Sequence, residues 1–236
     1  MNRDIVGGGR RRGPWAVVAG SAGGAGREIA VRLAEDGYSV VVCGRDSADV
    51  RETRQLIEWA GGRAVEVVVD LADSAAVHRL VTEIRRLLAG APAEVLVTNA
   101  GAADFDSAAD GLDMAFDLYV KMPFLLTGAF APAMAERGRG AIVTVFDGAT
   151  GARDANAVRA AMAALMSLNG LWTAEYGPRG VRINSVQLPG GGEPVATAEA
   201  VRFLVSPQAA SVCGSILPLG AGAAAVDIHG RPLAPG

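Results

Sequence analysis

Short apolar runs alternate with longer stretches of helical periodicity along nearly the whole chain, and this alternation constrains the fold more than any other feature. The candidate strands are residues 15–19, 39–43, 64–69, 94–98, 141–145, 181–186 and 215–219. Apolar positions at helical spacing predict helices over residues 26–36, 50–60, 74–88, 112–137, 156–176 and 198–205. Strands that alternate with helices form a parallel sheet covered by helices. We therefore predict a single α/β domain of the Rossmann type.

This domain is expected to cover residues 14–226. Residues 1–13 are rich in Gly and Arg and predict a flexible lead-in, and residues 227–236 are interpreted as a tail. Half of the residues are hydrophobic, so a large core needs no disulfide, and Cys43 and Cys213 are interpreted as small core hydrophobes. The net charge of −3 does not favour nucleic acid as a partner. Without a signal peptide or a membrane-spanning run, we expect a cytoplasmic protein.

The turn after the first strand has the sequence GSAGGAG over residues 20–26. Glycines between a strand and a helix permit positive φ, let the backbone approach a pyrophosphate and leave amide donors at the helix N-terminus. The alternative is that the glycines serve only a tight turn. Because the turn lies in the first βαβ unit, we predict a dinucleotide cradle formed by Gly20, Ser21, Gly24, Ala25 and Gly26.

Three motifs in order resemble those of the short-chain dehydrogenase/reductase (SDR) family: the glycine spacing of the turn, Asp70-Leu71 after the third strand, and Asn99-Ala100-Gly101 after the fourth. The likeness runs from about residue 15 to residue 222. It implies a seven-stranded parallel sheet with helices on both faces. It also implies that Asp70, Leu71, Asn99, Ala100 and Gly101 contribute to the dinucleotide site, with the Asp near the adenine.

The end of the second strand indicates which dinucleotide is bound. Enzymes that use NAD place an acid there for the ribose 2′-hydroxyl, whereas a nearby Arg accommodates the 2′-phosphate of NADP. This chain has Gly44 at the acid position and Arg45 directly after it. We therefore predict NADP(H), retained as a bound or structural ligand; the alternative is that Arg45 is simply solvated.

The residues that the family uses for carbonyl reduction are absent. Family members use a Tyr, a Lys four residues later on the same helix face, a Ser and an Asn. The only tyrosines of the chain are followed four residues later by Val42, Pro123 and Gly180, and Lys121 is its only lysine. By register with the family, the Tyr, Lys, Ser and Asn positions hold Val158, Met162, Asp147 and Tyr119.

Two of these replacements retain reactive groups. Asp147 lies at the end of the fifth strand, and we expect the phenol of Tyr119 to lie beside it. A partly desolvated carboxylate beside a phenol can act as a general base or acid, so both residues are our catalytic candidates. The alternatives are a turn-capping residue for Asp147 and a packing aromatic for Tyr119. His78 and His229 are interpreted as structural or solvent-facing, and no spacing predicts a metal site.

Only residues 187–194, with the sequence QLPGGGEP, separate the sixth strand from the next helix. Family members insert a substrate-covering segment here, so we expect an open or differently closed pocket for a small-molecule substrate. The two helices over residues 112–137 and 156–176 carry more apolar residues than one buried face needs. In the family these helices pack against their copies, which predicts a homodimer or homotetramer.

Three functions remain open. The first is an atypical biosynthetic enzyme that uses the family's substrate pocket for isomerisation, dehydration or cyclisation, with Asp147 as the base. The second is an NADPH-dependent reductase of a quinone-like substrate, for which a proton donor is less necessary. The third is a non-catalytic partner of an active SDR.

Overall fold

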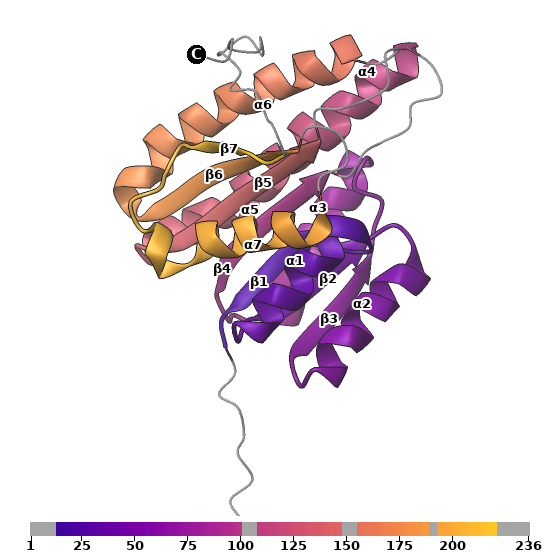
Figure 1. Ribbon diagram of the computed structural model, residues 1–236, viewed down its shortest axis with the longest axis vertical. Helices are drawn as coiled ribbons and strands as arrows, with labels where there is room; N and C mark the ends of the chain where they lie inside the picture. The colour runs from indigo at the N-terminus through magenta and orange to yellow at the C-terminus, as the bar shows by residue number, and fades with distance from the viewer. Residues whose placement is uncertain (1–12, 101–107, 148–154, 189–192, 221–236) are drawn as a thin grey trace, which may run out of the picture.

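The computed structural model describes residues 13–100, 108–147, 155–188 and 193–220. Its seven strands form one parallel sheet in the order β3-β2-β1-β4-β5-β6-β7 (Figure 1). The strands are β1 (Trp15–Ala19), β2 (Ser39–Gly44), β3 (Arg63–Val68), β4 (Ala93–Ala100), β5 (Gly140–Asp147), β6 (Val181–Leu188) and β7 (Ile216–Pro218). This is the predicted Rossmann-type α/β fold. The predicted lead-in and tail lie almost entirely outside the described residues.

Helices cover both faces of the sheet (Figure 1). One face carries α1 (Gly24–Glu35), α2 (Ser47–Trp59) and α7 (Pro194–Val205), which share one hydrophobic cluster. The other carries α3 (Ser74–Leu88), α5 (Met122–Glu136) and α6 (Ala155–Tyr176), which share a second cluster. α4 (Ala108–Phe116) and the π-helical turn η1 (Asp117–Lys121) lead directly into α5. Short 3-10 turns, η2 (Gly177–Arg179) and η3 (Pro207–Ala209), precede β6 and β7.

The central strands are apolar throughout because both of their faces are buried. In β1, the side chains of Trp15, Val17 and Ala19 enter the cluster under α3, α5 and α6. The intervening Ala16 and Val18 enter the cluster under α1, α2 and α7. The sheet therefore separates two hydrophobic cores.

The structure corrects several expected boundaries. β4 and β5 run further than predicted because their pairing continues through Asn99↔Val145 and Ala100↔Phe146. The helix expected over residues 112–137 is widened into a π-turn just before Pro123. A proline ring clashes with the carbonyl four residues earlier in a regular α-helix, and a wider turn relieves that clash. α7 begins at Pro194 rather than near residue 198, because proline suits the first turn of a helix.

The continuous helical stretch Gly111–Glu136 is long and apolar enough to cross a membrane by length and composition. Half of its most apolar window is buried inside the protein. Its place under β4 and β5 accounts for that hydrophobicity, since a core helix needs apolar residues as well.

Candidate functional site

The glycine-rich turn joins β1 to α1 at the carboxyl edge of the sheet. Gly20 has φ of 82°, and a Cβ on Gly26 would lie 1.9 Å from the carbonyl oxygen of Gly20. The side-chain amide of Asn99 donates to that same oxygen at 2.9 Å. Contacts within the protein therefore require glycine at positions 20 and 26. At these two positions the tight turn alone explains the glycine, as the alternative interpretation of the motif expects.

Two other glycines of the turn face open space. A Cβ on Gly23 or Gly24 would meet no atom within 4 Å, and Gly24 has φ of 51°. Gly23 is the N-cap of α1, and no side chain caps the first turn of this helix. The first amide groups of a helix have no intrahelical acceptor and favour anions. These residues fit a dinucleotide pyrophosphate, and Ala25 lies half-buried in the same first turn.

Ser21 has a different role from the one predicted. Its side chain is fully buried; the hydroxyl donates to the carbonyl of Val18 at 2.7 Å and accepts the amide of Cys43 at 2.9 Å. The amides of Gly20 and Ser21 both donate to the carbonyl of Cys43. The side chain and the amide of Ser21 thus both tie the turn to β2.

The end of β2 presents an exposed cation next to an acid that caps the following helix. Gly44 is buried, and Arg45 directly after it is exposed. Asp46 is the N-cap of α2 and accepts the amides of Ala48 and Asp49 at 2.7 and 3.1 Å. These hydrogen bonds, that of Asp49 first, hold the pKa of the Asp46 carboxyl below its usual value. Because Asp46 is engaged in capping, Arg45 is the charged group that this strand end offers to a ribose phosphate.

The remaining predicted cofactor residues lie at the same edge. Asp70 is exposed beyond β3, where one carboxylate oxygen accepts the amide of Ala72 at 3.0 Å, and Leu71 is buried. Asn99 and Ala100 are buried at the end of β4. Strands are added on one side of β1 up to β3 and on its other side from β4 onward, so the strand order switches between β1 and β4. Parallel α/β sheets bind ligands at such a switch point. Gly101 lies outside the described residues.

The described residues at the family's proton-donating positions are apolar. Val158 and Met162, at the family's Tyr and Lys positions, are 1% and 9% exposed and belong to the core cluster beneath α6. Tyr119 is fully buried in that cluster, within the π-turn. Asp147 is the last residue of β5, opposite Leu188, and its side chain lies outside the described part of the chain. The predicted pairing of Asp147 with Tyr119 stays a prediction.

Two residues beside the turn carry no signal in the sequence. Arg27 and Thr53 both hydrogen-bond the carbonyl of Ala22. Thr53 lies on α2, far along the chain from the turn, so no local spacing could have indicated the contact. Within the described ranges, no group of three or more His, Cys, Asp or Glu could hold a metal ion.

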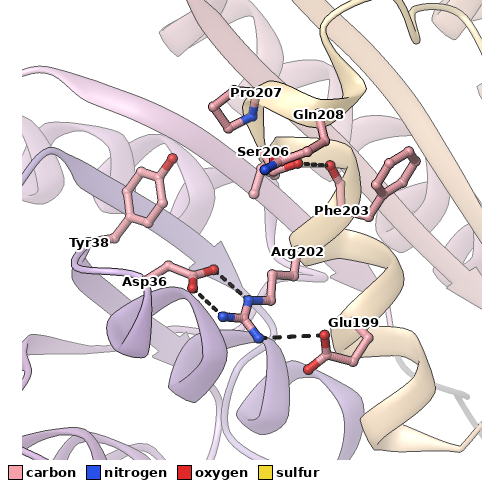
Figure 2. Close-up of a pocket in the computed structure, with 9 residues that line it drawn as sticks. Asp36, Tyr38, Glu199, Arg202, Phe203, Ser206, Pro207 and Gln208 are labelled. Carbon is pink, nitrogen blue, oxygen red and sulfur yellow. Dashed lines mark hydrogen bonds and ion pairs between the residues drawn. The ribbon is translucent and has the colours of Figure 1, made fainter.

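A hollow of about 460 Å³ lies at the opposite, amino-terminal edge, between α1, β2 and α7 (Figure 2). The Arg202 guanidinium on its wall is paired with Asp36 at 2.8 Å and with Glu199 at 3.6 Å. The hydroxyl of Ser206 donates to the carbonyl of Phe203. These polar groups satisfy one another, so the hollow presents no unpaired charge to a ligand.

Comparison with known proteins decides the family. The short chain dehydrogenase model matches residues 14–201, which is most of the chain. The chain belongs to the short-chain dehydrogenase family. This agrees with the three motifs of the carboxyl edge and with the seven-stranded sheet.

Relatives of this SDR chain include both enzymes and a protein named without an activity. This chain is 28% identical to protein FixR of Bradyrhizobium diazoefficiens, over 87% of this chain and 85% of the relative. It is also 28% identical to the (3R)-3-hydroxyacyl-CoA dehydrogenase of Canis lupus familiaris, over 87% and 94%. A metagenomic short-chain oxidoreductase solved in complex with NADP superimposes with a TM-score of 0.78 at 29% identity, covering 89% of this chain and 99% of that one.

Proposed function

We propose that this chain binds NADP(H) at the carboxyl edge of its sheet and reduces quinone-like acceptors rather than isolated ketones. The observation that carries the proposal is a contrast between described residues of the phosphate-facing turn and those at the family's proton-donating positions. The uncapped turn at Gly23–Gly24 and the exposed Arg45 remain suited to a dinucleotide phosphate. The proton-donating positions hold the buried apolar side chains of Val158 and Met162.

Arg45 supports NADP(H) over NAD(H). A charge-assisted hydrogen bond to a 2′-phosphate is worth about 1.5–3 kcal/mol when well formed. The structural neighbour solved with NADP is consistent with this preference. When bound, NADPH supplies a hydride, and the chain's own task is to hold it and to shape the acceptor pocket.

The apolar positions argue against ketone reduction. A ketone that receives hydride becomes an alkoxide, and general acid catalysis of its protonation is typically worth about 10²–10⁴-fold. Neither Val158 nor Met162 can donate a proton or stabilise an oxyanion. A quinone spreads the added charge over its ring, so its reduction depends less on a dedicated donor.

Two measurements test this function. Fluorescence titration should show tighter binding of NADPH than of NADH, and Arg45→Ala should reduce that difference. A panel of ketones and quinones with NADPH should then show turnover for quinones and near-background rates for ketones. Robust ketone reduction, or equal affinity for the two dinucleotides, would contradict the proposal.

The two alternatives give different results in the same assays. Non-redox chemistry with Asp147 as base predicts an activity that needs no NADPH oxidation and falls in Asp147→Asn, with Tyr119→Phe as the companion variant. The dehydrogenase and oxidoreductase relatives favour hydride transfer over this alternative. A non-catalytic partner subunit predicts NADPH binding with no turnover. It is favoured by the exposed apolar side chains of Phe124, Met166 and Leu171 on α5 and α6.

A further inference from the structure

We infer that Arg27 and Thr53 are positioning residues that hold the glycine-rich turn in the shape that receives a dinucleotide pyrophosphate. The inference rests on the proposed NADP(H) binding and adds the groups that fix the binding turn. Arg27 follows the last glycine of the turn on α1, and Thr53 lies on the facing side of α2. Neither residue is part of the glycine motif itself.

Both side chains meet at one backbone oxygen. The Nη2 of Arg27 donates to the carbonyl of Ala22 at 2.9 Å, and the hydroxyl of Thr53 donates to the same oxygen at 3.2 Å. The Nε of Arg27 also donates to the Thr53 hydroxyl at 3.1 Å, which orients that hydroxyl toward the turn. Thr53 is fully buried, so these hydrogen bonds do not compete with bulk water at the hydroxyl. The three groups form a closed triangle that ties the turn to α2.

The carbonyl of Ala22 immediately precedes the open part of the turn. A peptide unit is planar and trans, so its N–H points opposite to its C=O. Holding the carbonyl of Ala22 toward α2 therefore directs the amide of Gly23 away from α2. Gly23 and Gly24 have no Cβ to restrict them and leave the most backbone freedom in this segment. A fixed carbonyl at Ala22 removes much of that freedom before a ligand arrives, which lowers the entropic cost of binding.

The charge of Arg27 is already balanced within the protein. Its Nη2 lies 2.8 Å from the carboxylate of Glu52 and 3.5 Å from that of Asp49. The Arg27 side chain is only 24% exposed, and its guanidinium is held between these acids and the turn. Arg27 therefore acts on the turn through geometry, whereas Arg45 is the exposed cation for a phosphate.

The decisive variants separate the hydroxyl of Thr53 from its volume. Thr53→Val keeps the shape and removes the donor, whereas Thr53→Ser keeps the donor. We expect Thr53→Val and Arg27→Leu each to weaken NADPH binding about three- to tenfold, with Thr53→Ser close to wild type. Arg32→Leu is the matched control, since Arg32 lies on the same helix and pairs with Glu35 and Glu199, away from the turn.

A fragment and an exchange measurement distinguish positioning from general damage. Adenosine 2′-monophosphate has the 2′-phosphate but no pyrophosphate, so its affinity should stay unchanged in Thr53→Val. Amide hydrogen exchange of residues 20–26 should be faster in Thr53→Val than in Thr53→Ser without any dinucleotide present. Equal NADPH affinity or equal exchange in the two Thr53 variants would overturn the inference, as would a parallel loss of the fragment. If the wild type binds no NADPH, the proposed function fails. The hydrogen-exchange comparison alone then decides whether the clamp, meaning the hydrogen bonds of Arg27 and Thr53 to the carbonyl of Ala22, holds the turn.

Discussion

Single glycines in one short turn have different physical reasons for being glycine. Gly20 and Gly26 allow two backbone segments and Asn99 to approach one another. Gly23 and Gly24 border open space. The same residue type therefore serves the fold at two positions and leaves room for a ligand at two others.

Substituting these glycines should separate the two reasons. Gly26→Ala places a Cβ 1.9 Å from the Gly20 carbonyl, so we expect a loss of about 2–4 kcal/mol in the free energy of unfolding and loss of NADPH binding. Gly23→Ala is the control, because Gly23 has an extended φ of −156° and no atom near its Cβ position. Its unfolding free energy should stay within about 0.5 kcal/mol of wild type. Urea titration measures both, and a Gly26→Ala variant of native stability would refute the close contact.

The buried thiol of Cys43 gives the fold a pH dependence. Burial raises its pKa from 9.0 to about 12. The unfolded thiol ionises above pH 9 while the folded thiol stays neutral, so this group favours unfolding increasingly as pH rises toward 12. The loss is about 1.4 kcal/mol per pH unit.

Comparison with Cys43→Ala isolates this contribution. We expect the unfolding free energy of wild type to fall more steeply between pH 9 and pH 10.5 than that of the variant, by about 1–2 kcal/mol over the range. Chemical denaturation at several pH values provides the measurement. Parallel curves for the two proteins would mean that Cys43 does not stay neutral in the folded state.

Among the elements, α7 is held to the sheet by a buried apolar face and, at its end, by one charged side chain of β6. Arg182 on β6 donates to four carbonyls at the end of α7 and just beyond it, those of Leu204, Val205, Ser206 and Ala209. The last carbonyls of a helix have no intrahelical donor, and a cation there is favourable. A second link, between Arg202 of α7 and Asp36 after α1, lies nearer the surface (Figure 2).

Removing the two arginines should therefore have unequal effects. Arg182→Leu leaves several partly buried carbonyls without a donor, so we expect a loss of about 2–4 kcal/mol in the free energy of unfolding. Arg202→Ala breaks a more exposed ion pair and should cost about 1 kcal/mol or less. Thermal and urea unfolding of both variants test the ranking. A larger effect at Arg202 would show that the surface link, rather than the carbonyl cluster, holds α7.

At the scale of the whole molecule, α5 and α6 carry apolar side chains that stay exposed among the described residues. Part of the apolar surplus expected on these two helices belongs to the core, including Leu126, Met162 and Leu165. Others are exposed: Phe124 by 52%, Met166 by 38% and Leu171 by 65%. A large exposed apolar patch on a soluble domain marks an interaction surface.

We expect a homodimer or higher homo-oligomer assembled through this surface. Leu171→Glu places a charge at the most exposed of these three side chains and should shift the protein toward the monomer at micromolar concentration. Phe203→Glu on α7 is the matched control, since Phe203 is 46% exposed on the other face of the sheet. Light scattering distinguishes the species. A stable wild-type monomer at micromolar concentration would contradict the predicted assembly.

The sequence by itself determined the layers, the strand-to-helix alternation and the absence of a Tyr-x-x-x-Lys pair, because each of these is a local pattern along the chain. It also indicated the glycine-rich turn and the cation at Arg45, since both lie at the junction between a strand and a helix. The cytoplasmic location and the predicted cofactor-binding and catalytic roles of the site residues, Asp147 and Gly101 among them, stay predictions.

Only the tertiary structure decided what the individual residues of the edge do. Ser21 turned out to bind Cys43 and β1 rather than to face a ligand, and Tyr119 to lie in the core. The clamp of Arg27 and Thr53 on Ala22 joins residues on different helices. Such contacts depend on how neighbouring elements pack, and side-chain direction at a packed surface is set by both partners, so spacing along one element does not specify it.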